Sequence, residues 1–262
     1  MVERENGARV ERTLTEIRNV TLPNDMKQSR LHQKLRVSQG FSLIELLVVI
    51  AIIGVLASLV VGLSGIAGRK SREAKVRAEL AQYVTAIERF KDHFGYYPPD
   101  NFSTNSTGIK VVDPTINPLF YELTGVFVDN KAEAFQSGQT TISAGMVSAV
   151  FRRDGFVNAV DSTQAKSVKS FLPNLKASQV KTVRIGKFNT GPVVQLLVVP
   201  VDYPPSYPGP RPNVFPIPAV NPTPINPWRY VSTNPTNNPN SFDLWAEVPL
   251  GREIKVIGNW KE

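Results

Sequence analysis

One carboxylate in this sequence lies where an ionised group is unfavourable. Glu45 directly precedes residues 46–68, twenty-three consecutive residues without a charge. At about 1.5 Å per helical residue, such a segment covers the roughly 30 Å hydrocarbon core of a bilayer. An ionised side chain in that core costs about 2.5–3.5 kcal/mol on insertion scales, so it is normally retained for a function. We therefore expect Glu45 to meet a partner charge that is delivered after the chain is processed.

The bond between Gly40 and Phe41 is the candidate processing point. Gly40, Phe41, Glu45 and the apolar run after them resemble the N-terminal motif of type IV pilins and type II secretion pseudopilins. In that family a prepilin peptidase cuts after the glycine and methylates the new phenylalanine amine, which implies cleavage after Gly40 and N-methylation of Phe41 here. The alternative is an ordinary signal anchor with a stray glutamate. A cleavable secretory signal fits poorly, because its apolar region is typically about 7–15 residues long.

An assembly role for Glu45 follows from pairing these two charges. On a helix, Phe41 and Glu45 would be i, i+4 neighbours on one face. Cleavage creates an ammonium group on Phe41, and an ion pair offsets much of the desolvation of both partners. The resemblance implies that the carboxylate meets the amine of a neighbouring subunit and sets the axial register of a growing filament.

Small residues recur along the apolar segment, with Gly54, Ser58 and Gly62 at intervals of four. Such rows allow helices to approach closely where lipid supplies no hydrophobic drive, so we predict helix packing there. The alternative is the ordinary composition of membrane helices. Many family members carry proline where Gly62 stands, so we expect no proline-based kink.

Residues 1–40 are expected to be a cytoplasmic leader that prepilin peptidase removes. Basic residues flank the apolar segment on both sides, so the charge rule alone does not orient it. The resemblance implies a single pass through the bacterial inner membrane, with the C-terminal domain in the periplasm. Translation from Met26 instead of Met1 would leave a leader of fifteen residues, and both starts stay open.

The periodicity changes after residue 68 and predicts an α+β, pilin-like fold. Apolar residues then recur every three or four positions, as in an amphipathic helix, which Gly95 and the following Pro98-Pro99 end. We predict one helix over 41–94, with a transmembrane and polymerisation part (41–68) and an amphipathic part (69–95) packed on a small C-terminal antiparallel sheet. The apolar stripe consists of Val76, Leu80, Tyr83, Val84, Ile87, Phe90 and Phe94.

The remaining residues, 96–262, are expected to complete a periplasmic domain. A short helix should follow Asn117-Pro118 and end before Gly125. Residues 126–178 indicate a variable connection with short helices, and residues 200–227 indicate an extended proline-rich loop without regular ladder bonds. Strands are predicted at 183–185, 193–199, 228–231, 242–245 and 254–257.

Short motifs resemble those of the type II secretion major pseudopilin in order and spacing. They are Gly95-Tyr96-Tyr97-Pro98, Asn226-Pro227-Trp228-x-Tyr230, Ser241-Phe242-Asp243-Leu244 and Ile257-Gly258-Asn259-Trp260. The absence of cysteine excludes a disulfide and leans toward the secretion branch.

We expect no cofactor. The family often binds calcium in its last loop, and calcium takes six to eight oxygen ligands. Residues 248–257 supply only Glu253, with Glu247 and Asp243 nearby. We therefore expect a calcium site to be missing or weak.

Enzymatic chemistry has little support in this composition. The two histidines, His32 and His93, lie in the predicted leader and near the end of the amphipathic helix, and no metal-ligand spacing or glycine-rich phosphate loop occurs. The net charge of +8 is partly carried by the leader and is otherwise dispersed, so we expect no nucleic-acid partner.

The resemblance implies a structural pseudopilin that polymerises into a periplasmic pseudopilus for type II secretion. Its expected partners are the prepilin peptidase, other pilin or pseudopilin subunits, the inner-membrane assembly platform with its ATPase, and the secretin channel. One alternative is a type IV pilin subunit for adhesion, motility or DNA uptake. The other is a membrane-anchored binding protein that does not polymerise and uses residues 126–227 for recognition.

Overall fold

The computed structural model describes residues 40–104, 106–138, 140–163, 168–186, 190–203, 212–217, 225–250 and 253–260. The predicted leader up to residue 39, the alternative start at Met26 and His32 lie outside the described residues. The chain divides into two units, residues 1–52 and residues 53–262. All strands and helical segments that the structure describes after α1 lie in the second unit.

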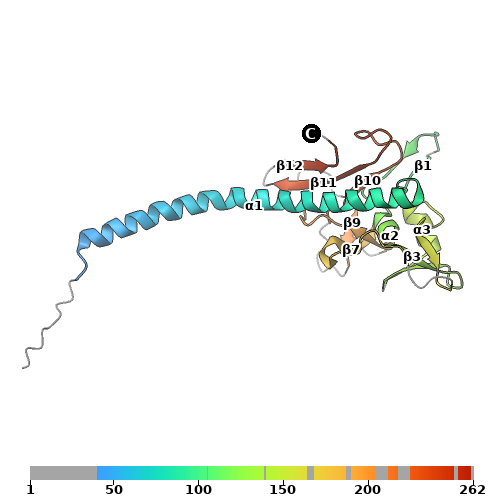
Figure 1. Ribbon diagram of the computed structural model, residues 1–262, viewed down its shortest axis with the longest axis horizontal. Helices are drawn as coiled ribbons and strands as arrows, with labels where there is room; N and C mark the ends of the chain where they lie inside the picture. Colours follow the sequence, from blue (N-terminus) through green and yellow to red (C-terminus); the bar gives the residue numbers. More distant parts are fainter. Residues whose placement is uncertain are drawn as a thin grey trace, which may run out of the picture. The chain divides into compact units, whose positions relative to one another are not determined.

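A single helix, α1 (Leu43–Phe94), accounts for 52 residues and confirms the uninterrupted helix (Figure 1). It begins two residues later than predicted, after Ser42. It ends at Phe94, and the next residue, Gly95, has φ +85° and donates its N–H to the carbonyl of Lys91 at 2.7 Å. That backbone conformation favours glycine, as predicted for a helix stop.

In the part of the chain that the structure describes, no helix meets the length and apolarity required of a membrane crossing. The membrane-spanning role of residues 41–68 therefore stays a prediction.

The amphipathic part of α1 supplies one wall of the core in the second unit. Val76, Ile87 and Phe90 are fully buried. Tyr83 packs edge-on against Trp228 with ring centroids 5.3 Å apart, and Phe90 lies 5.4 Å from Phe171. The predicted stripe is therefore core, although Val84 and Phe94 are only partly buried.

Among the described residues, the second unit contains four small sheets beside the amphipathic part of α1, and residues 126–161 build one of them (Figure 1). The other three are the pair β1–β2, the sheet β8-β7-β9 and the sheet β10-β11-β12, all antiparallel. Their bounds are β1 (Ser103–Thr104), β2 (Lys110–Val111), β7 (Val180–Ile185), β8 (Val193–Leu197), β9 (Val214–Pro216), β10 (Arg229–Val231), β11 (Asp243–Leu250) and β12 (Glu253–Gly258). The predicted strands in these regions are confirmed.

Strand β9 corrects the prediction that residues 200–227 form no ladder. Its register pairs Val214 with Ile185 and Pro216 with Val183. Because β9 lies at the edge of its sheet, the missing N–H of proline is tolerated there. Residues 204–211 and 218–224 of this segment lie outside the described residues.

The central segment also differs from its prediction. The expected short helix is present as α3 (Ala144–Phe151), but residues 126–161 also build a four-stranded sheet in the order β5-β4-β3-β6. The pairing of β3 with β6 is parallel, so the fold has several small sheets instead of one antiparallel sheet. The strands have only three or four residues, too few for alternation to predict them. They are β3 (Val126–Asp129), β4 (Ala134–Ser137), β5 (Thr140–Ser143) and β6 (Ala159–Asp161).

The predicted short helix before Gly125 is confirmed as α2 (Leu119–Thr124), and it carries a fully buried carboxylate. Glu122 accepts hydrogen bonds from the backbone N–H groups of Val157 and Asn158, each at 3.1 Å. These bonds attach the segment before β6 to α2. Burial nevertheless raises the pKa of Glu122 to about 7, because desolvation outweighs the hydrogen bonds and the nearby Arg153.

The raised pKa of Glu122 predicts a loss of stability at higher pH. The folded state binds this proton more tightly than the unfolded chain, so its contribution is complete below about pH 4.5 and is lost as pH rises through 7. We expect the free energy of unfolding in detergent solution to fall by up to about 3 kcal/mol between pH 5 and pH 8. Urea titrations should show that Glu122→Gln removes most of this difference, whereas the exposed Glu253→Gln keeps it. An unchanged pH profile in Glu122→Gln would refute the assignment.

Candidate functional site

The N-terminus of α1 is held by two reciprocal hydrogen bonds. The hydroxyl of Ser42 accepts from the backbone N–H of Glu45 at 3.3 Å, and the carboxylate of Glu45 accepts from the backbone N–H of Ser42 at 2.9 Å. This is a capping box, in which two backbone donors without helical partners are satisfied at once. Glu45 lies in the first turn of α1, where an acidic side chain stabilises the helix through the helix dipole.

This geometry corrects the predicted relation between Phe41 and Glu45. Phe41 precedes the helix, so the two residues are not i, i+4 neighbours on a helical face. The carboxylate of Glu45 instead accepts from the backbone N–H of Ser42. Ser42 would be the second residue of the chain after the predicted cleavage. The spacing Ser-x-x-Glu was available in the sequence and could have revealed Ser42 as the missing member of the site.

Apolar side chains are exposed along the start of α1. Phe41 and Leu43 are 83% and 87% exposed, and even Val49 retains 45%. A helix that is apolar all round normally lies inside a protein or a membrane. This part of the chain therefore presents an exposed apolar surface.

The predicted helix-packing residues make no packing contact within the chain where it is described. A side chain at Gly54 would meet nothing within 4 Å. Ser58 donates its hydroxyl to the carbonyl of Val55 at 2.7 Å, as hydroxyls within helices commonly do. Gly62 is part of α1, but its surroundings lie outside the described residues. A packing role for these residues stays a prediction that requires a partner helix.

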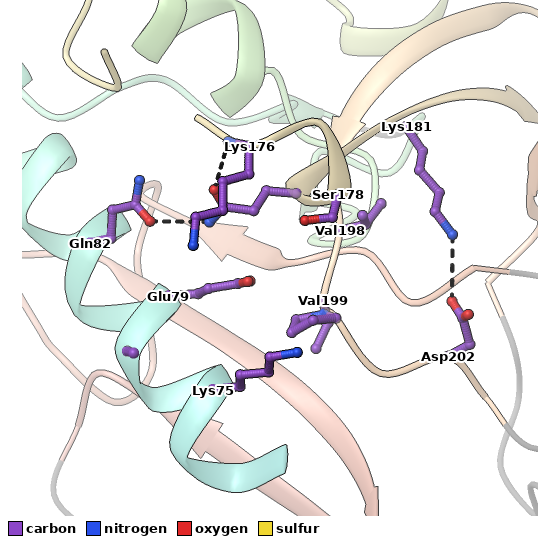
Figure 2. Close-up of a pocket in the computed structure, with 12 residues that line it drawn as sticks. Lys75, Glu79, Gln82, Lys176, Ser178, Lys181, Val198, Val199 and Asp202 are labelled. Atoms are coloured by element: carbon purple, nitrogen blue, oxygen red, sulfur yellow. Dashed lines mark hydrogen bonds and ion pairs between the residues drawn. The ribbon is translucent and has the colours of Figure 1, made fainter. Parts of the chain in front are cut away.

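A second candidate site is a pocket of about 520 Å³ beside the amphipathic part of α1 (Figure 2). Its walls come from three segments, namely α1, the stretch from Lys176 through η1 (Ala177–Gln179) into β7, and the residues that follow β8. Gln179 donates to the side-chain oxygen of Gln82 at 3.1 Å, which joins the first two walls. Because these walls are distant in sequence, no local pattern predicted the pocket.

Glu79 is the half-buried carboxylate of this pocket, and Figure 2 shows it directed inward from α1. Burial raises the pKa of Glu79 to about 6; Trp228, Lys176 and Lys75 oppose this shift. The Trp228 indole lies close enough to Glu79 to lower the pKa of that carboxyl group. The two groups nevertheless form no hydrogen bond, because both the indole N–H and the buried Oε2 atom of Glu79 are without a hydrogen-bond partner. Across the pocket, Lys181 and Asp202 form an ion pair at 3.7 Å. The pocket thus combines cations and carboxylates in a polar recess.

The three acidic residues considered for calcium do not share one loop. Residues 248–257 lie largely in the β11–β12 hairpin, where Val248 pairs with Lys255. Asp243 accepts from the backbone of Asn237 and Asn238, and Glu247 forms an ion pair with Arg229 at 2.9 Å. Among the described residues, no group of three or more His, Cys, Asp or Glu side chains is placed to hold a metal ion. Whether the chain binds calcium stays a prediction.

Comparison with known proteins shows that the N-terminal site contains a recognised sequence motif. Residues 35–61 match the prokaryotic N-terminal methylation motif, a range that includes Gly40, Phe41 and Glu45. The chain is also similar to type II secretion system core protein G of Escherichia coli (strain K12), with 39% identity over 83 residues. That match covers 31% of this chain and 54% of the relative, so the chain spans about half the length of the relative it matches. No solved structure matches. The motif and the relative together support membership of the type IV pilin and pseudopilin family.

Proposed function

We propose that this chain is a structural pseudopilin subunit that is cut between Gly40 and Phe41, methylated on Phe41 and polymerised for type II protein secretion. The observation that carries the proposal is the exposed apolar surface at the start of α1. The carboxylate of Glu45 lies in the first turn of this helix, close to the bond between Gly40 and Phe41, and is held there by the capping box. The methylation motif covers the same residues. The similarity to a type II secretion core protein favours the secretion branch over a surface pilus.

The capped N-terminus suggests how assembly is controlled. Before cleavage, Glu45 satisfies a neutral backbone N–H of its own chain. Cleavage creates an ammonium group on Phe41, and its full positive charge attracts the carboxylate more strongly than a neutral backbone N–H does, most of all in apolar surroundings. The ammonium of a neighbouring subunit therefore competes well for the carboxylate. Packing of the apolar helices in the filament would then replace contacts with lipid, and small residues at the contact would allow the helices to approach closely.

The remaining expectations define where this subunit would act. Residues 41–68 would cross the bacterial inner membrane once and leave the domain in the periplasm. The prepilin peptidase would process the chain, and the assembly platform with its ATPase would insert it among other subunits beneath the secretin. In this proposal the pseudopilus pushes folded proteins outward, and the subunit itself has no catalytic role and no cofactor.

Mass spectrometry of the membrane-extracted protein tests the processing step. We expect a mature N-terminus at Phe41 that carries one methyl group. An intact bond between Gly40 and Phe41 in cells with an active prepilin peptidase would overturn the proposal.

Deletion of the gene tests the secretion branch. We expect the secreted proteome to lose folded exoproteins while surface filaments persist. Normal export with loss of surface filaments or of DNA uptake would instead indicate a type IV pilin.

A further inference from the structure

A row of cations follows the apolar segment on one face of α1. Arg69, Arg72 and Lys75 are spaced by three residues, which places them on the same side of the helix, and all three are exposed. We call these three residues the basic face. Within the described residues, Arg69 and Arg72 form no hydrogen bond or ion pair. The nearest acidic residue in the helix, Glu73, is engaged by Arg77 at 3.0 Å and Lys255 at 2.8 Å, so it does not neutralise them.

The basic face leads into the pocket of Figure 2. Lys75 lines the pocket, and Figure 2 shows its ammonium group directed across it toward Val199. The exposed Lys176 lines the same pocket from the segment before η1. Two carboxylates lie here. Glu79 is attracted by the charges of Lys75 and Lys176, and Asp202 forms an ion pair with Lys181. Cations therefore outnumber carboxylates along this side of the domain.

The position of the basic face along the helix indicates which anion it meets. The uncharged residues 46–68 would measure about 34 Å as a helix, slightly more than the roughly 30 Å hydrocarbon core. If they cross the bilayer, the next turn reaches the level of the phosphate groups. A Lys or Arg side chain beside an anionic lipid surface gains about fivefold in affinity for each cation. Guanidinium groups also match the geometry of phosphate oxygens.

We propose that the basic face, assisted by Lys176, binds the phosphate headgroups of anionic phospholipids on the side of the membrane that holds the globular domain. This inference rests on the proposed membrane anchoring by residues 41–68. The contact would hold the domain against the bilayer until the subunit is extracted into a filament.

Lipid binding to the full chain in neutral detergent tests the inference. Phosphatidylglycerol or phosphatidylcholine is titrated in, and bound lipid is counted by native mass spectrometry. The test variant is Arg69→Gln/Arg72→Gln/Lys75→Gln. The control, Arg89→Gln/Lys131→Gln/Lys169→Gln, removes the same charge from exposed positions elsewhere on the domain. We expect the wild type and the control to prefer phosphatidylglycerol, and the test variant to lose at least about tenfold in that affinity.

Three results would overturn the inference. Equal binding of both lipids by the wild type would remove the preference that it requires. Displacement of the lipid by millimolar inorganic phosphate would show a site for free phosphate. Loss of self-association in the test variant, without a change in lipid preference, would assign the basic face to a second copy of the chain.

Carbonate extraction of membranes separates this inference from the proposed function. We expect all three proteins to resist extraction. Release of the wild type would refute the anchoring and the headgroup site together. Retention of the wild type without a preference for phosphatidylglycerol would refute the headgroup site alone.

Discussion

Replacing Glu45 with alanine is expected to give a subunit that is still cleaved and membrane-bound but does not enter filaments. The variant loses the carboxylate that would receive the ammonium group of a neighbouring Phe41. That ammonium group would then enter the apolar filament interior without a partner, and a single unpaired charge in lipid costs about 2.5–3.5 kcal/mol. A cost of this size corresponds to a loss of incorporation of about a hundredfold.

The capping box complicates this variant, because alanine also removes the bond to Ser42. Losing a helix cap costs about 1 kcal/mol, which could weaken assembly without any role for charge. Glu45→Gln separates the two effects, since glutamine can complete a capping box but carries no charge. We expect Glu45→Gln to fail nearly as completely as Glu45→Ala. Ser42→Ala, which loses the cap but keeps the carboxylate, should retain most incorporation.

Incorporation can be measured from the sheared filament fraction of cells that express each variant. The N-terminal mass of the membrane-bound protein shows whether processing has occurred. Normal filaments from Glu45→Gln would show that Glu45 acts only as a helix cap, and the proposed ion pair between subunits would be wrong.

Replacing Trp228 with alanine is expected to cause the largest loss of stability in the globular domain, about 3–5 kcal/mol. Trp228 is fully buried and packs edge-on against Tyr83 of α1. Its backbone N–H donates to Leu197 at the end of β8, and its carbonyl accepts from Asn117 before α2 at 2.8 Å. One residue thus joins three segments that are distant in sequence, and alanine would leave a cavity among them.

Urea unfolding followed by circular dichroism in detergent solution would measure this loss. Trp245→Ala is the matched control, because Trp245 is only half-buried and its ring contacts Trp260 at 5.9 Å. Trp228→Phe keeps most of the buried volume and removes an indole N–H without a hydrogen-bond partner. It should therefore remain folded even if Trp228→Ala does not. An equal loss in Trp228→Ala and Trp245→Ala would contradict the central position of Trp228.

Local chemistry was enough to predict much of this protein from its sequence. Hydrophobic periodicity predicted α1, and Gly95 predicted its end, because both effects act within a few residues of the chain. The motif around Gly40, Phe41 and Glu45 indicated the same family as the later comparisons. The capping role of Ser42 was also readable from its spacing to Glu45, although the predicted pairing placed Phe41 inside the helix instead.

The tertiary structure alone decided features that depend on contacts between distant segments. The parallel pairing of β3 with β6, the edge strand β9 and the buried carboxylate of Glu122 have no local pattern. The pocket beside Lys75 likewise forms only when α1 meets the residues around η1 and β8. A helix and its caps are specified by neighbouring residues, whereas a buried charge or a pocket is specified by whichever distant groups the fold brings beside it.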